Sequence, residues 1–262
     1  IKWLGDKYRI RYEQSASAMT LRRTLKKKIA PGGLFAVADP VFGKDDLRSG
    51  VGVAQKPSAF SLMQAVQEQG GLRLDRLEET GVLARRLGKL FKRENPELLL
   101  GKEAKKKSIF KKDLTKYKYI VFATHGLLGG KVSGLLEPAL ALSRDKGAKE
   151  RDSFLSLSEA MTLKLNADVV ALTACETGLG KDVAGEGVMG MGRAFQYAGA
   201  KSVLVSLWSV AEKSATLLAE RFFTYLKKGK DKVTAIRQAR KDVRKAGYKH
   251  PFFWAPFILI GD

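Results

Sequence analysis

YIVFATHG (residues 119–126) and DVVALTACETG (residues 168–178) decide the fold, because each is an apolar run of strand length that ends in residues able to react. The first run ends in His125 and Gly126, and the second reaches Cys175. Further apolar runs alternate with segments of helical periodicity, which is typical of βα units and a mostly parallel sheet. We therefore expect a doubly wound or three-layer α/β domain, with strands at 34–38, 119–124, 168–174, 201–208 and 257–260.

The segments between these strands predict the helices. Ser156 followed by Glu159 forms a capping box that indicates a short helix before the third strand. The opening segment 7–12 resembles a strand, and the Gly-rich, charged stretch 129–151 is expected to be a mobile connection. The longer helices are predicted at 15–28, 75–92, 186–198, 211–227 and 232–246.

Composition excludes several classes of protein. A chain of 262 residues with 45% hydrophobic residues can bury a substantial core. A run of about 20 apolar residues would be needed for a membrane helix, and neither such a run nor a signal peptide is present, so we expect a soluble cytoplasmic protein. One cysteine allows no internal disulfide, and two histidines cannot complete a Cys/His zinc cage. We predict no metal and no cofactor.

The net charge of +21 favours acidic partners, and nucleic acid is kept as a candidate. The densest basic run, 102–118, is interrupted by acidic and apolar residues, so it also fits the solvated side of a helix or turn. No aromatic pair of the RNA-recognition type and no zinc knuckle accompanies it. Binding to phosphates, if present, should weaken steeply as salt rises.

His125 and Cys175 are predicted to meet, because carboxyl ends of neighbouring parallel strands line one crevice. An imidazole beside a thiol favours the nucleophilic thiolate and can later protonate a departing amine. The backbone N–H groups of Gly126 and Cys175 are candidate oxyanion donors. Taken singly, a free cysteine is more often a small buried hydrophobe, and a lone histidine is usually bonded locally. Their shared position favours a cysteine hydrolase.

Other motifs are set aside or left open. GEGVMG (185–190) matches a dinucleotide fingerprint but does not follow a strand directly, so we reject nucleotide binding. Asp182 and Glu186 follow Cys175 and either line a pocket for a basic side chain or are solvated loop carboxylates. His250 is expected to have a structural role in a turn, and Trp208 belongs to the core or to a pocket wall.

The sequence resembles the CHAT domains, caspase-like peptidases that are often attached to tetratricopeptide repeats and are distantly related to separase. The resemblance covers most of the chain and is strongest at VFATHG (121–126), LNADVVALTACETGLG (165–180), the stretch 185–208 and HPFFWAPFILIGD (250–262), with weaker matches at 12–25 and in ADPVF (38–42). It implies a caspase-like three-layer α/β/α fold, His125 and Cys175 as the catalytic dyad, and endopeptidase activity without metal or cofactor.

The resemblance also has a departure. Relatives commonly carry a turn of the type WPVDD, in which an acid helps separases to recognise Arg, whereas this chain reads Trp208, Ser209, Val210, Ala211, Glu212. One acid is lost and Glu212 is retained, so we expect Glu212, with Asp182, Glu186 and Trp208, to form the substrate pocket. We expect this pocket to favour Arg or Lys before the scissile bond, and a preference for a hydrophobic residue there stays an alternative.

We expect one domain over 1–262, with an N-terminal pseudo-half (1–118), a catalytic half (119–262) and a missing region upstream. The function predicted is an endopeptidase that cleaves a partner protein and is regulated by a partner or a tetratricopeptide-repeat module. The alternative is a silent protease-like interaction scaffold, with nucleic-acid association as a further candidate.

Overall fold

The computed structural model describes residues 3–24, 28–42, 46, 48, 74–129, 135–144, 148–173 and 186–261. Its centre is a six-stranded sheet in the order β2-β1-β3-β7-β8-β9. All neighbouring strands pair in parallel except β8 and β9, which are antiparallel. The strands are β1 (Leu34–Pro40), β2 (Glu97–Gly101), β3 (Tyr119–Ala123), β7 (Val169–Leu172), β8 (Ser202–Ser206) and β9 (Phe257–Gly261).

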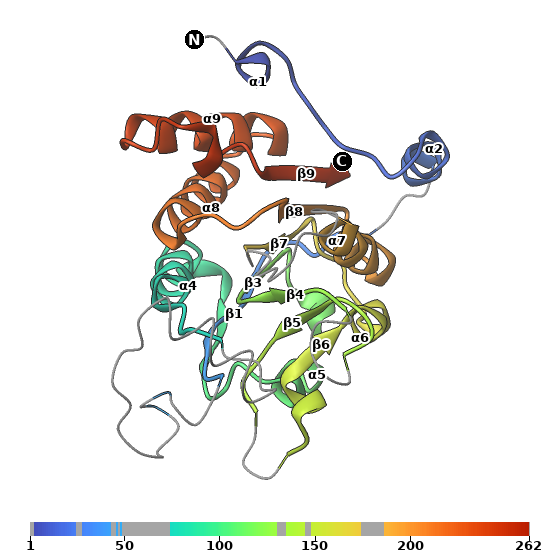
Figure 1. Cartoon of the computed structure of the whole chain (residues 1–262). Helices are drawn as coiled ribbons and strands as arrows, with labels where there is room; N and C mark the ends of the chain where they lie inside the picture. The colour runs from blue at the N-terminus through green and yellow to red at the C-terminus, as the bar shows by residue number, and fades with distance from the viewer. Residues whose placement is uncertain are drawn as a thin grey trace.

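Helices cover both faces of this sheet (Figure 1). Because successive strand residues point to opposite faces, β3 sends Tyr119 and Val121 into one apolar cluster and Ile120 and Phe122 into another. The first cluster is completed by α4 (Glu78–Leu90), α8 (Glu212–Lys227) and α9 (Lys232–Lys245). The second is completed by α5 (Lys106–Phe110), α6 (Leu157–Thr162) and α7 (Glu186–Ala198). The expected three-layer α/β/α fold with a mostly parallel sheet is confirmed.

Four of the predicted helices match the structure closely. Helix α7 has the predicted bounds, and α8 and α9 differ from theirs by one residue at one end. The capping box is present: the Ser156 hydroxyl accepts a hydrogen bond from the Glu159 N–H, and the Glu159 carboxylate accepts one from the Ser156 N–H.

Two expectations about the less regular parts of the chain were wrong, and one strand was missed. Over 4–7 the chain forms a short helix, α1 (Leu4–Lys7), and only Tyr12 pairs with a strand, in a single parallel bridge to Ile260. The stretch 129–151 is not merely a connection, since β5 (Ala139–Ala141) lies within it. Strand β2 was missed because it is short, lies at the sheet edge and is only partly buried.

Strand β5 belongs to a second, three-stranded antiparallel sheet with β4 (Gly126–Leu127) and β6 (Phe154–Ser156). Strand β4 begins directly after His125, and the backbone N–H of Ala141 donates to the His125 carbonyl at 2.9 Å. The small sheet therefore fixes the backbone on the far side of His125.

The N-terminal segment packs on the C-terminal part of the chain. The Asp6 carboxylate accepts two hydrogen bonds from the Arg244 guanidinium of α9, at 2.6 and 2.9 Å. The Trp3 ring lies edge-on to Trp254, with 5.2 Å between centroids. Helix α2 (Ala16–Thr24) follows this segment. No helix in the described ranges combines the length and the apolarity that crossing a membrane requires.

Candidate functional site

His125 lies just beyond the carboxyl end of β3 and is 6% exposed. The preceding residue, Thr124, donates from its hydroxyl to the Ala141 carbonyl at 2.5 Å, which ties the end of β3 to the small sheet. The His125 ring also packs against Phe42, with 5.0 Å between ring centroids. The imidazole is therefore held in place by packing as well as by its backbone.

One ring nitrogen of His125 has a defined partner. Nε2 lies 2.8 Å from the backbone carbonyl oxygen of Asp75, and because a carbonyl only accepts, Nε2 must carry the proton. Nδ1 is then the nitrogen through which the ring can exchange a proton. Burial lowers the pKa of His125, and the hydrogen bond to Asp75 opposes this only in part. The ring is thus kept in its neutral, basic form.

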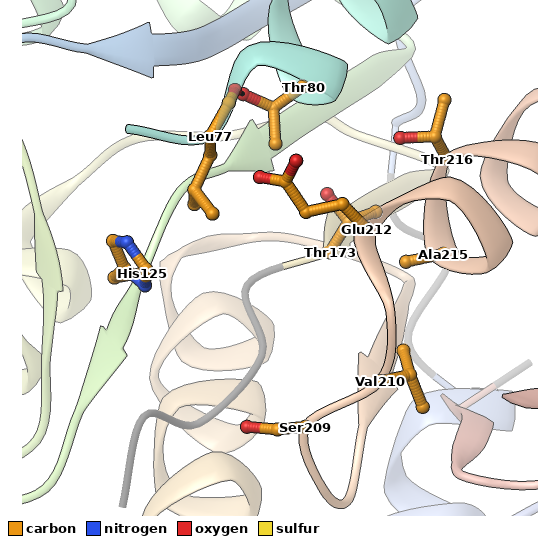
Figure 2. A pocket seen from close by; sticks show the side chains of 9 residues that line it. All are labelled: Leu77, Thr80, His125, Thr173, Ser209, Val210, Glu212, Ala215 and Thr216. Carbon is orange, nitrogen blue, oxygen red and sulfur yellow. Dashed lines mark hydrogen bonds between the residues drawn. The ribbon is translucent and has the colours of Figure 1, made fainter. Parts of the chain in front are cut away.

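His125 lines a cavity of about 170 Å³ at the carboxyl edge of the sheet. The lining comes from the ends of β3 and β7, the entry to α4, and the turn that leads from β8 into α8. Figure 2 shows the Glu212 carboxylate pointing toward Leu77, with His125 across the cavity from it. The lining residues are Leu77, Thr80, His125, Thr173, Ser209, Val210, Glu212, Ala215 and Thr216.

Glu212 opens α8 and is the acidic group of the cavity. Its Oε1 is buried and accepts no hydrogen bond from any residue that the structure describes. Burial raises the pKa of Glu212, a backbone hydrogen bond from Glu79 lowers it, and the negative charges of Glu79, Glu78 and Asp39 raise it further. A carboxylate in such surroundings gains from a cation brought in by a ligand.

Thr173 carries the second unpartnered group of the cavity. Its Oγ1 is buried and has no hydrogen-bond partner in the described part of the chain. Its backbone N–H donates to the Phe122 carbonyl at 3.1 Å, so it follows β7 in direct contact with β3. A ligand that offers hydrogen-bond donors could satisfy both Thr173 and Glu212.

The structure places the predicted site residues unequally. His125 and Glu212 line one cavity. Trp208 is not in the cavity lining: it precedes Ser209, and its Nε1–H donates to the Phe252 carbonyl at 3.1 Å. Gly126 begins β4. Cys175 and Asp182 lie outside the described residues, as does the side chain of Glu186, which begins α7.

Sequence reasoning missed several groups at this edge. The Asp75 carbonyl that orients His125 has no sequence signature, because every residue carries one. Leu77, Thr80 and Thr173 are small or apolar residues that look like ordinary core and cap positions. The sequence did contain a signal for Asp39, because it is an acidic residue near the end of an otherwise apolar strand, directly before Pro40. Within the described ranges, no group of three or more His, Cys, Asp or Glu side chains could hold a metal ion.

Comparison with known proteins places this chain in a family. The model of the CHAT domain matches residues 1–262, the full chain. Tetratricopeptide repeat protein 28 of Mus musculus is 31% identical over 113 residues, and the protein of the same name from Homo sapiens is 33% identical over 113 residues. Those residues make up 43% of this chain but only 5% and 4% of the two relatives.

Proposed function

The chain belongs to the CHAT domain family, whose fold is caspase-like and related to peptidases, and from this premise we propose that it is a cysteine endopeptidase with His125 and Cys175 as its catalytic dyad. The observation that carries the proposal is the state of His125. A neutral imidazole, with Nε2 committed to the Asp75 carbonyl, sits at the strand end next to the one that leads to Cys175.

Chain connectivity supports the pairing. Thr173 lines the same cavity as His125, and Cys175 is two peptide units further along the chain. Two trans peptide units span at most about 7–8 Å between Cα atoms, and this short connection supports the proposed pairing of Cys175 with His125. The chain contains one cysteine, and therefore a thiol nucleophile can only be Cys175.

The reaction then follows from the proton positions. His125 Nδ1 takes the thiol proton of Cys175, and the thiolate attacks the scissile carbonyl carbon to form a tetrahedral oxyanion. The backbone N–H groups of Gly126 and Cys175 are the proposed oxyanion donors. As the carbon–nitrogen bond breaks, the imidazolium returns the proton to the departing amine. Water then hydrolyses the thioester, with His125 again as the base.

Glu212 is the proposed specificity residue, favouring Arg or Lys before the scissile bond. Its Oε1, which has no partner among the described residues, makes the cavity attractive to a cation, although the chain as a whole carries +21. Asp182, Glu186 and Trp208 are retained as proposed contributors to substrate binding. Regulation by a tetratricopeptide-repeat module is proposed because the two relatives are named for that repeat.

Labelling with peptide acyloxymethyl ketones tests the dyad. Because there is one cysteine, mass mapping should place a single adduct on Cys175. We expect His125→Ala to slow labelling sharply at neutral pH and Cys175→Ala to abolish it, with both variants folded. His250→Ala is the matched control, since it removes the other histidine, and it should label like the wild type. Equal labelling rates in His125→Ala and the wild type would reject the dyad.

Peptide-library cleavage tests the pocket. We expect a basic preference in the wild type that is reduced in Glu212→Gln. A non-basic preference in the wild type, or an unchanged basic one in the variant, rejects Glu212 as the pocket acid. Folded protein that neither labels nor cleaves, even with a tetratricopeptide-repeat module supplied, would instead support the silent scaffold.

A further inference from the structure

Asp39 is an unusual residue at the carboxyl end of β1. Its φ of +48° lies in the left-handed region, which residues other than glycine rarely adopt. The register of β1 against β2 shifts between Ala38 and Pro40, so Asp39 sits in a bulge. Bulges re-aim side chains next to functional sites, and a strained backbone persists only where its surroundings fix it.

The carboxylate of Asp39 is buried, with its side chain 6% exposed, and it binds two arginines. The Arg76 guanidinium donates two hydrogen bonds to it, from Nε to Oδ1 at 3.1 Å and from Nη2 to Oδ2 at 3.0 Å, and this bidentate pair is called the fork below. Arg48 Nη1 lies 3.0 Å from Oδ2. Gly81 of α4 makes room, since a Cβ there would lie 3.0 Å from the Asp39 Cβ.

These contacts converge on the segment that holds His125. Arg76 follows Asp75 directly, and the Asp75 carbonyl accepts the hydrogen bond from His125 Nε2. Two residues later α4 begins, and its Thr80 hydroxyl accepts a hydrogen bond from the Asp39 N–H at 2.9 Å while donating to the Leu77 carbonyl at 2.6 Å. Asp39 therefore holds the chain at two points, Arg76 and Thr80, which both follow the Asp75 carbonyl closely.

We propose that Asp39, acting through Arg76, is a positioning residue that holds the Asp75 carbonyl against His125 Nε2 and so fixes the imidazole in its Nε2–H tautomer. The bidentate fork defines the orientation of Arg76 and hence of the adjacent peptide. Without it, the peptide can rotate and the ring can carry its proton on either nitrogen. The catalytic consequence rests on the proposed dyad, whereas the structural consequence does not.

The tautomer can be read directly, because the chain has only two histidines. In ¹⁵N-labelled protein, protonated and unprotonated ring nitrogens give separate signals, and His250→Asn identifies those of His125. The variants are Arg76→Gln, which removes the fork, and Arg76→Lys, which keeps the charge and loses the fork. Arg86→Gln is the matched control: it removes an arginine of α4 whose partner, Glu220 at 2.8 Å, does not line the cavity.

We expect the wild type and Arg86→Gln to show His125 as a single Nε2–H tautomer. Arg76→Gln should show a mixture of tautomers, and Arg76→Lys should lie between them. Displacement of a catalytic group by about 1 Å can cost about 100-fold in rate, so kcat should fall by up to that factor in Arg76→Gln while KM changes little. If Arg76→Gln does not fold, Arg76→Lys is compared with the wild type instead, because lysine keeps the positive charge at this position.

A single, unchanged tautomer in the folded Arg76 variants would overturn the proposal. So would an equal tautomer mixture in Arg86→Gln, because the effect would then not belong to the fork. A tautomer mixture confined to the Arg76 variants, in protein that shows no peptidase activity with any substrate, supports the positioning role and counts against the proposed function. The two ideas therefore fail separately.

Discussion

Replacing Glu212 by Gln is expected to stabilise the fold while it weakens recognition of a basic side chain. The carboxylate is partly buried, Oε1 lacks a partner among the described residues, and the nearby acids Glu78, Glu79 and Asp39 oppose its charge. A buried unsatisfied polar group costs about 1–3 kcal/mol, and more when it is charged. Gln keeps a polar group at this place but removes the charge, and partial access to solvent reduces the gain, so we expect about 1 kcal/mol. For a chain of this size that corresponds to a rise in Tm of about 2–4 °C.

The direction of the pKa shift of Glu212 determines how the stability of the fold depends on pH. Because the pKa of Glu212 is raised in the fold, the folded state takes up a proton more readily than the unfolded state. The charge therefore destabilises the fold at neutral pH, and this penalty disappears as the pH falls below the ordinary carboxyl value of 4.5. The Tm of Glu212→Gln should exceed that of the wild type at neutral pH, and the gap should close in acid.

Differential scanning calorimetry across this pH range is the assay. Glu220→Gln is the control, because Glu220 also lies in α8 but is paired with Arg86, and it should not raise the Tm. An arginine peptide should raise the Tm of the wild type more than that of Glu212→Gln. The reasoning fails if Glu212→Gln melts at or below the wild type at neutral pH, or if the gap is the same in acid.

Two further predictions concern a buried base and a glycine. NMR titration should place the His125 midpoint below 6.5, because burial lowers its pKa; a midpoint above that value would contradict the geometry. Gly199→Ala should destabilise the fold by about 3 kcal/mol or more, since its φ is +132° and a Cβ would lie 2.0 Å from the Leu165 carbonyl oxygen. Gly247→Ala, at φ +102° with open space around it, should cost only about 1 kcal/mol in urea unfolding; equal losses would show that the close contact is relieved.

The central sheet could be predicted because its strands are nearly continuous apolar runs. Val169–Leu172 is buried throughout, as expected for a parallel strand covered on both faces, and the reactive residues after such runs mark the edge where ligands bind. This logic selected His125, whereas Glu212 was selected through the resemblance of its turn to that of the CHAT domains; both residues line one cavity. The same logic could not find the small antiparallel sheet, whose strand β4 has only two residues and no periodicity to read.

The contacts that orient the His125 ring could not be predicted from sequence patterns, for a different reason. The contact that orients the ring comes from a main-chain carbonyl, which depends on backbone conformation and not on the residue type. The Asp39–Arg76 fork joins residues 37 positions apart, and nothing in their local sequence links the two. Tertiary geometry alone reveals such pairs.

The bridge between Tyr12 and Ile260 has a consequence for association. The Tyr12 N–H donates to the Leu259 carbonyl at 3.1 Å, and the Tyr12 carbonyl accepts from the Gly261 N–H at 2.9 Å. These are the outward-facing groups of β9, an edge strand of the main sheet, and a strand left open there is a template for pairing with another chain. The N-terminal segment therefore covers this edge of the sheet. Its release from β9 exposes backbone groups that can pair with another chain, and its binding to β9 keeps them occupied.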